Sequence, residues 1–264
     1  MRNIFDTHAH YTDDRFRDVP GGPDALLREM FDGDVSEIVN VSVNTRNSLD
    51  VVAQAKRFDG MYAAVGVYPE DASAEEGGLD GALSRLRALL DRREENKIVA
   101  VGEIGLDYHC ENPDKPLQKA FFEAQLRLAE EYGLPVIVHD REAHGDCFDA
   151  VLAHPGVRGI FHSFSGSAEM AKELSRRGWY ISFSGVITFK NAPRVREAAA
   201  AVPLDRLLLE TDAPYLAPEP YRGRTNRSDY IAHSAEALGA LFGRSGEEMR
   251  EITRNNAKKL FSIA

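Results

Sequence analysis

The sequence predicts a single (β/α)8 barrel domain covering residues 1–264, on three observations. Short apolar runs alternate with amphipathic segments from one end of the chain to the other. The apolar runs are nearly continuous, which is typical of strands buried on both faces of a parallel sheet. Polar residues able to bind metal follow the first and the last of these runs, and a closed barrel brings those two strands together on one face, whereas an open sheet would separate them.

Eight short runs rich in apolar and β-branched residues are the expected strands. The repeat of about 30 residues fits a strand followed by a helix, and no Pro/Ser-rich linker interrupts it. The expected strands cover residues 3–6, 37–43, 62–67, 98–103, 135–139, 159–162, 180–184 and 206–210.

Amphipathic segments between these runs are the expected helices. In the first of them Leu83, Leu86 and Leu90 recur at steps of three and four, which places them on one helical face. The segment 115–132 is followed by Gly133, a residue that favours the end of a helix. The last begins with Ser245 as N-cap and Glu248 three residues later. The expected helices cover residues 79–96, 115–132, 167–178, 193–201 and 245–261.

Composition and charge limit the class of protein. A formal net charge of −10 argues against a protein that coats nucleic acid through a broad basic face. The N-terminus lacks a signal-peptide pattern, and no run of about 18 apolar residues occurs, so we expect no membrane segment. The two cysteines, Cys110 and Cys147, suggest a reducing compartment and two partly buried free thiols. We therefore expect a cytoplasmic protein.

The sharpest local signal is the pair His8 and His10 at the end of the first strand. Residues two apart on an extended chain point to the same side, so both imidazoles can face one ion. Glu103 is expected at the end of the fourth strand, where a carboxylate among apolar residues is costly unless it is paired or binds metal. It can also bridge two ions.

Three further candidates follow later strands: His139, His162 and Asp212. Either histidine alone would be interpreted as a hydrogen-bonded core residue, but their equivalent places in successive units favour metal binding. Asp212 could serve as a metal ligand that also takes a proton from the metal-bound water. The remaining histidines, at positions 109, 144, 154 and 233, are expected to be exposed, with His109 closest to the active face.

Five stretches together resemble the TatD-type metal-dependent deoxyribonucleases, a branch of the amidohydrolase-like barrels. The resemblance runs over nearly the whole chain, and the combination is more specific than any one motif. The stretches are Asp6–His10, Gly102–Asp107, Val138–His139 with Arg141, His162–Gly166 and Glu210–Leu216.

The resemblance implies a hydrolase with two divalent ions, Mg, Zn or Mn. One ion would be bound by His8, His10, Glu103 and Asp212, and the other by Glu103, His139 and His162, with Glu103 as the bridge. Asp212 would orient or deprotonate the attacking water. The implied substrates are phosphodiester bonds at the ends of DNA, or of RNA, and no obligate protein partner is implied.

The resemblance also implies that Arg141 and Arg224 bind substrate phosphate. Two positions depart from the family pattern. Tyr68 stands where the family usually carries the histidine of Gly-Val-His-Pro, a residue of catalysis or phosphate binding, and a phenol can donate a hydrogen bond but cannot become a cation. Asn226-Arg227-Ser228 stands where the family has Asn-x-Pro.

Two other functions remain open. The first is a binuclear amidohydrolase-type enzyme acting on a small ester, amide or phosphoester, because one fold supports many reactions. Glu103 argues against it, since many such barrels carry a modified lysine on the fourth strand. The second is a non-catalytic metal-binding or nucleic-acid-binding protein. The presence of every ligand, including the base Asp212, argues against that.

Overall fold

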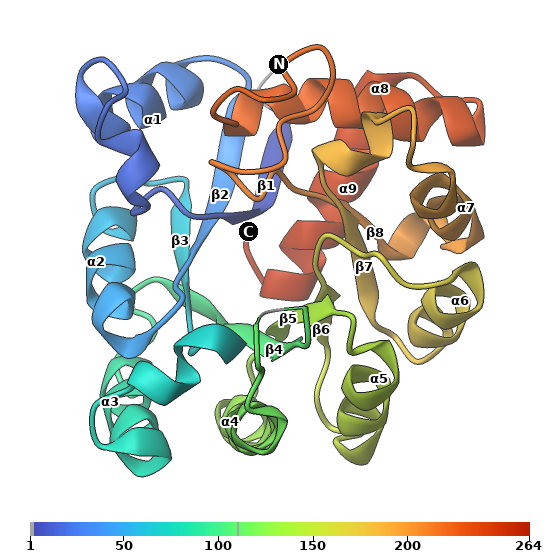
Figure 1. Cartoon of the computed structure of the whole chain (residues 1–264). Helices are drawn as coiled ribbons and strands as arrows, with labels where there is room; N and C mark the ends of the chain where they lie inside the picture. The colour runs from blue at the N-terminus through green and yellow to red at the C-terminus, as the bar shows by residue number, and fades with distance from the viewer. Residues whose placement is uncertain (1–2, 110) are drawn as a thin grey trace. The chain divides into compact units, whose positions relative to one another are not determined.

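Eight strands alternate with helices in the computed structural model, which describes residues 3–109 and 111–264 (Figure 1). The strands form one sheet whose neighbours follow the order β1 to β8. The pairs β1–β2, β3–β4 and β7–β8 are parallel. A parallel bridge joins Ala9, at the end of β1, to Ala213, which follows β8. The first strand therefore meets the last, and the predicted (β/α)8 barrel is confirmed.

Contacts within the chain divide it into two compact units. Unit 1 comprises the described residues 3–40 and 162–264. The prediction that residues 1–264 form one domain stays a prediction. The elements of unit 1 are β1 (Ile4–Ala9), η1 (Asp14–Phe16), α1 (Gly22–Asp32), β2 (Val35–Val41, its last residue in unit 2), α6 (Ala168–Arg176), β7 (Tyr180–Phe183), η3 (Gly185–Thr188), α7 (Pro193–Ala201), η4 (Leu204–Arg206), β8 (Leu207–Leu209), η5 (Ser228–Tyr230), α8 (Ile231–Phe242) and α9 (Gly246–Phe261).

Unit 2 comprises residues 41–109 and 111–161 of the described chain. Three of its four strands are buried over most of their length, as expected for a parallel sheet covered by helices. Its elements are α2 (Thr45–Ala55), β3 (Met61–Val65), η2 (Pro69–Ala74), α3 (Gly78–Leu90), β4 (Ile98–Asp107), α4 (Lys115–Tyr132), β5 (Val136–Arg141), α5 (His144–Ala153) and β6 (Gly159–Phe161).

The ends of two predicted helices are confirmed together with the signals that set them. Helix α4 starts after Asp114, whose side chain accepts a hydrogen bond from the Leu117 N–H, and it ends at Gly133 with φ of 65°. Helix α9 follows Ser245, and Ser245 and Glu248 form the predicted capping box. Helix α9 packs against β1 and β8, where Phe261 stacks on Phe5 at 5.9 Å between ring centroids.

Several predicted boundaries are wrong. Helix α3 ends at Leu90 and not at Asn96, because the Asn96 side chain donates a hydrogen bond to the Leu89 carbonyl and turns the chain. Strand β4 continues past Glu103 to Asp107. Glu103 therefore lies inside its strand, at a shift in the pairing register between Val101 and Ile104, and not at the strand end. The sequence patterns did not predict α1, α2, α5 or α8.

The histidines outside the candidate site differ from one another. His109 is exposed, as predicted, and lies 2.7 Å from a carboxylate oxygen of Glu142. His144 and His233 are half-buried. The prediction that His154 is exposed is wrong, because it is buried with its Nε2 atom 3.0 Å from Glu123. Cys147 is a free thiol but fully buried, and Cys110 lies outside the described residues.

Candidate functional site

Two histidines and one aspartate converge in unit 1 where β1 ends and β8 has just ended. The Nε2 atoms of His8 and His10 lie 2.9 Å apart. Asp212 Oδ1 lies 3.5 Å from the first and 3.4 Å from the second. His8 lies within β1 and His10 directly follows it, so the strand places both rings on one side as predicted.

The backbone of the segment after β8 positions Asp212. Its N–H donates to the His8 carbonyl at 2.9 Å, and the His10 N–H donates to the Ala213 carbonyl at 2.7 Å. Asp212 adopts a φ of 58°, in the left-handed region that aspartate tolerates better than most residues. This turn brings its carboxylate back over the two histidines.

This donor set fits a divalent metal ion. Two imidazole nitrogens and one carboxylate oxygen all lie within 4.8 Å of one another. Ligand atoms about 2.0–2.2 Å from one ion lie roughly 3–4 Å apart, which matches this spacing. Burial opposes ionisation of Asp212, but its hydrogen bond with His10 and the charges of His8, His10 and His162 hold its pKa below the usual value. The cluster can therefore hold a cation.

Asp6 supports this cluster from within the barrel, a role that the sequence did not predict. Its Oδ1 accepts hydrogen bonds from the N–H groups of Thr211 at 3.0 Å and His8 at 3.2 Å. Its Oδ2 accepts from the hydroxyls of Thr211 at 2.5 Å and Ser228 at 2.7 Å. Burial raises the pKa of Asp6 to about 7, although these hydrogen bonds oppose the rise. Asp6 thus ties β1 to the segment after β8.

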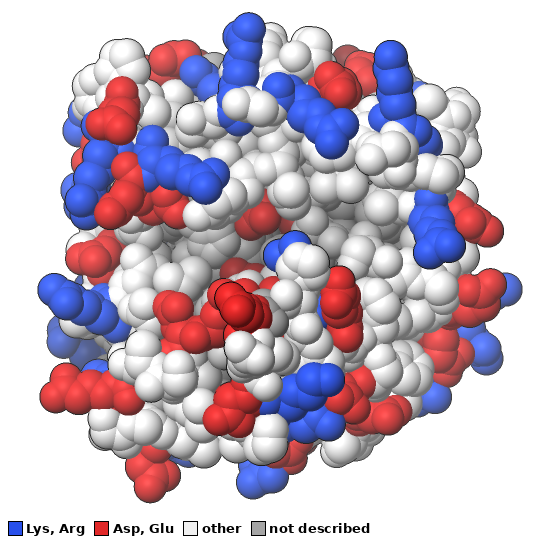
Figure 2. All heavy atoms as spheres, viewed as in Figure 1, with Lys and Arg blue, Asp and Glu red and all other residues white. Residues whose placement is uncertain are grey.

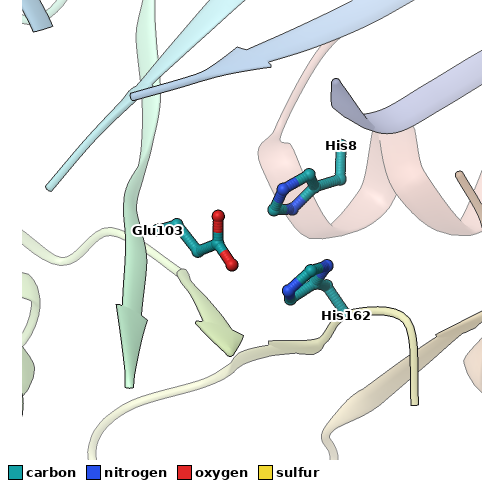
Figure 3. Close-up of side chains that lie close together, drawn as sticks. All are labelled: His8, Glu103 and His162. Carbon is teal, nitrogen blue, oxygen red and sulfur yellow. The ribbon is translucent and has the colours of Figure 1, made fainter. Parts of the chain in front are cut away.

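His162 follows β6 and has a carboxylate behind it. Its Nδ1 lies 3.2 Å from Glu210 Oε1, and the same oxygen accepts a hydrogen bond from the Ser163 N–H at 2.8 Å. Glu210 is fully buried. A carboxylate that holds one ring nitrogen leaves the other available to a metal. Figure 3 shows the His162 ring parallel to that of His8, with centroids 4.0 Å apart.

Unit 2 contains a second cluster, around His139 on β5. Its Nδ1 lies 2.9 Å from Glu103 Oε1, and its Nε2 lies 2.9 Å from Asp107 Oδ2. Glu103 projects from β4, where Figure 3 draws it, and is 3% exposed. Because Asp107 engages Nε2, Nδ1 is the atom through which His139 would share an ion with Glu103.

Tyr68 extends this second cluster. Its hydroxyl donates to Asp107 Oδ2 at 3.0 Å and lies 3.4 Å from His139 Nε2. Burial, followed by the charges of Glu103 and Asp107, raises the pKa of Tyr68, so the phenol stays a neutral donor. Burial alone would raise the pKa of Asp107, but its hydrogen bond with His139, the charge of that ring and further hydrogen bonds lower it to about 2.

The two arginines predicted to bind phosphate are both exposed. Arg141 is the last residue of β5, and Arg224 lies in the loop after β8. Their role, and that of Tyr68 in binding substrate, stay predictions.

The supporting carboxylates Asp6, Asp107 and Glu210 were not predicted from the sequence. All three stand in the motifs that carried the family resemblance, so their place beside the ligands was a signal that could have identified them. Within the described part of the chain, no helix has both the length and the apolar character needed to cross a membrane.

Comparison with known proteins gives a consistent result. The family model of TatD-related DNases matches residues 5–262. YabD, an uncharacterized metal-dependent hydrolase of Bacillus subtilis, is 38% identical, and the match covers 98% of this chain and 99% of YabD. YcfH, an uncharacterized metal-dependent hydrolase of Escherichia coli strain K12, is 35% identical, and the match covers 98% of this chain and 96% of YcfH. The crystal structure of YjjV, a TatD homologue from Escherichia coli K12, matches with a TM-score of 0.90 at 31% identity and covers 100% of this chain and 99% of that one.

Proposed function

We propose a phosphodiesterase acting on DNA ends, from the premise that this chain belongs to the TatD family and is a metal-dependent hydrolase. The observation that carries the proposal is the convergence of His8, His10 and Asp212 in unit 1. The description of the matching family as TatD-related DNases supports DNA as the substrate class. The presence of glutamate at position 103, and not lysine, supports the nuclease branch of these barrels.

The first metal ion would be bound by His8, His10 and Asp212. A bound divalent ion polarises a phosphoryl oxygen and lowers the pKa of water. The Asp212 carboxylate offers Oδ1 to this cluster and has a second oxygen that can accept the proton of the attacking water. Asp6 and the backbone turn at Asp212 hold these groups in place, so little reorganisation is needed when the substrate binds.

The second metal ion would be bound by Glu103 and His139 in unit 2. By the family resemblance, His162 would join this ligand set and Glu103 would serve both ions. Glu210 and Asp107 would fix the orientation of the two rings, as carboxylates behind metal-binding histidines do. Imidazole suits Zn, and carboxylate suits Mg and Mn, so this mixed set of donors is compatible with each of the three ions.

Arg141 and Arg224 would bind substrate phosphate, and Tyr68 would donate a hydrogen bond close to it. A guanidinium makes paired hydrogen bonds to phosphate oxygens, and both arginines are exposed enough to reach a substrate. The small number of cysteines supports a cytoplasmic location.

A substrate panel tests this proposal. The protein is stripped of metal and then loaded separately with Mg, Mn or Zn. It is incubated with end-labelled single-stranded and duplex DNA, RNA, a phosphotriester, a lactone and an aryl ester. We expect metal-dependent shortening of DNA from one end. Turnover of the small esters without any cleavage of DNA would instead identify an amidohydrolase-type enzyme, and metal binding without any turnover would identify a binding protein.

The variant Asp212→Asn is the matched test of the proton acceptor. It keeps the size and one ligand oxygen but loses the basic oxygen. We expect it to fold, to retain at least one metal ion and to lose about 10²–10⁴ in kcat. Near wild-type kcat with metal bound would assign the base to another group.

A further inference from the structure

The loops after β7 and β8 carry a concentration of positive charge in an acidic chain. Residues 185–196 and 215–230 contain six basic and two acidic side chains, whereas the whole chain has a net charge of −10. Figure 2 shows Lys and Arg side chains projecting from the upper part of the view, where Figure 1 draws the loop after β8 and helix α8. The two loops contact each other, since the Glu219 N–H donates to the Thr188 hydroxyl at 2.9 Å.

Two of these six cations have structural roles. Arg196 donates hydrogen bonds to the carbonyls of Ile187 and Phe189, and Arg227 forms ion pairs with Glu29 and Asp229. The other four are exposed, and within residues 3–109 and 111–264 no ion pair joins any of them to a carboxylate. We call these four the loop cations: Lys190, Arg194, Arg222 and Arg224.

Exposed arginines elsewhere in this protein are commonly paired. Arg92 lies 2.7 Å from Glu95, and Arg177 lies 2.8 Å from Glu173. The loop cations gather without such partners, and clustered like charges repel one another. A cluster of this kind favours an anionic ligand, which would relieve that repulsion.

A cavity of about 340 Å³ opens beside the loop cations. Its wall is largely apolar, with Asn191 and Arg194 as the polar groups. The Arg222 guanidinium carbon lies 4.2 Å from the centroid of the Phe189 ring, which is half-buried. The lining residues are Val186, Phe189, Asn191, Ala192, Pro193, Arg194 and Val195.

The combination of a largely apolar wall with one aromatic ring, an amide and unpaired guanidinium groups matches the chemistry of a nucleotide. Nucleobases stack on aromatic rings and on guanidinium planes, and an amide can hydrogen-bond to a base edge. The volume is at the lower end of the range of small-molecule sites. A second cavity, of about 590 Å³ in unit 2, provides a contrast: its wall carries Asp71, Glu75 and Glu76, and its Arg85 is paired with Glu75. With three carboxylates against two guanidinium groups, Arg46 and Arg85, that wall is net acidic and does not favour a polyanion.

We propose that the cavity and the loop cations form a subsite for a nucleotide that flanks the scissile phosphate of a single-stranded substrate. Phe189 and Arg222 stack on the base, and Arg194 and Lys190 bind its phosphates. The loop after β8 includes Asp212 as well as Arg222 and Arg224, so one loop carries both the proposed base and part of the subsite. This inference rests on the proposed function and adds that the substrate is a single strand longer than one nucleotide.

Binding and cleavage are measured separately to test the subsite. Binding uses a fluorescein-labelled single-stranded DNA octamer and protein kept metal-free with EDTA, followed by fluorescence anisotropy. Cleavage uses the same octamer and bis(p-nitrophenyl) phosphate, which has no flanking nucleotide. The variants are Arg194→Ala, Arg222→Ala and Phe189→Leu. The control is Arg28→Ala, which removes another exposed charge, from helix α1 of the same unit.

We expect each test variant to raise the octamer Kd and KM by about 5-fold or more, because stacking and phosphate contacts contribute on this scale. Each arginine variant should also reduce the salt dependence of binding by about 0.7 in the logarithmic slope. Turnover of bis(p-nitrophenyl) phosphate should not change, and Arg28→Ala should behave like wild type.

The two proposals fail in different ways. Variants that bind the octamer as tightly as wild type overturn the subsite, even if wild type cleaves DNA. A wild-type protein that does not bind the octamer also overturns it. Octamer binding that the variants weaken, in a metal-loaded protein that cleaves no DNA, supports the subsite and overturns the proposed phosphodiesterase.

Discussion

Asp6→Ala should destabilise the fold and weaken the metal cluster at the same time. Asp6 is fully buried and accepts four hydrogen bonds, from the His8 and Thr211 N–H groups and the Thr211 and Ser228 hydroxyls. Alanine leaves both N–H groups without this acceptor, and each buried unsatisfied donor costs about 1–3 kcal/mol. The hydroxyls can rotate, and that of Ser228 already lies 2.7 Å from the Tyr11 hydroxyl.

The net loss should be about 2–5 kcal/mol, since burial of the carboxylate itself is unfavourable and offsets part of the cost. For a chain near this size, that corresponds to a fall in Tm of roughly 5–15 °C. Urea and thermal unfolding measure the loss, and titration with Zn or Mn measures the cluster. Asp14→Ala is the matched control, because Asp14 is 74% exposed and forms only a surface ion pair with Arg17. A loss below about 1 kcal/mol for Asp6→Ala would refute the assigned role of Asp6.

Three further predictions concern residues around the histidines. Glu210→Gln should weaken metal binding about 10-fold in calorimetry, because His162 loses its charged partner; unchanged affinity would contradict this. Tyr68→Phe should raise KM for DNA and also weaken metal binding, since the phenol donates to Asp107; unchanged KM and metal affinity would contradict both roles. Arg141→Ala should raise KM for DNA about 10-fold and leave metal content unchanged, and loss of metal by elemental analysis would show a different role.

The sequence was sufficient for the fold class and for the cluster in unit 1, for a physical reason. His8 and His10 are two residues apart on a strand, and a closed barrel requires the first strand to meet the last, where Asp212 follows. Those two facts predict that the three side chains lie close together, and the prediction needs no knowledge of side-chain packing. Glu103 was misplaced because its strand continues to Asp107, and the break in register beside it depends on pairing with β5.

Helices were predicted where their signals lie within the helix itself. Helix α4 has an aspartate cap, a regular apolar stripe and a glycine stop. Helix α1 has a glycine cap without a side-chain hydrogen bond, and it buries mainly Leu26, Leu27 and Met30. In a barrel a helix buries only one face against the sheet, so three apolar residues are enough and the periodic signal is weak. The strand pairing around such a helix, and not its own sequence, then makes it stable.

The supporting carboxylates show where sequence reasoning stops. Asp6 stands two residues before His8 on the same strand, so the two-residue repeat places both on one side of β1, and spacing alone could have linked them. Asp107 reaches His139 only because Gly105 pairs with His139 in the β4–β5 register, which places Asp107 two residues beyond that pair and on the same side of the strand. Glu210, directly after β8, reaches His162, directly after β6, across strands that the sequence does not align. A carboxylate behind a ligand can thus be inferred from sequence when both lie on one strand, whereas across strands it requires the pairing register.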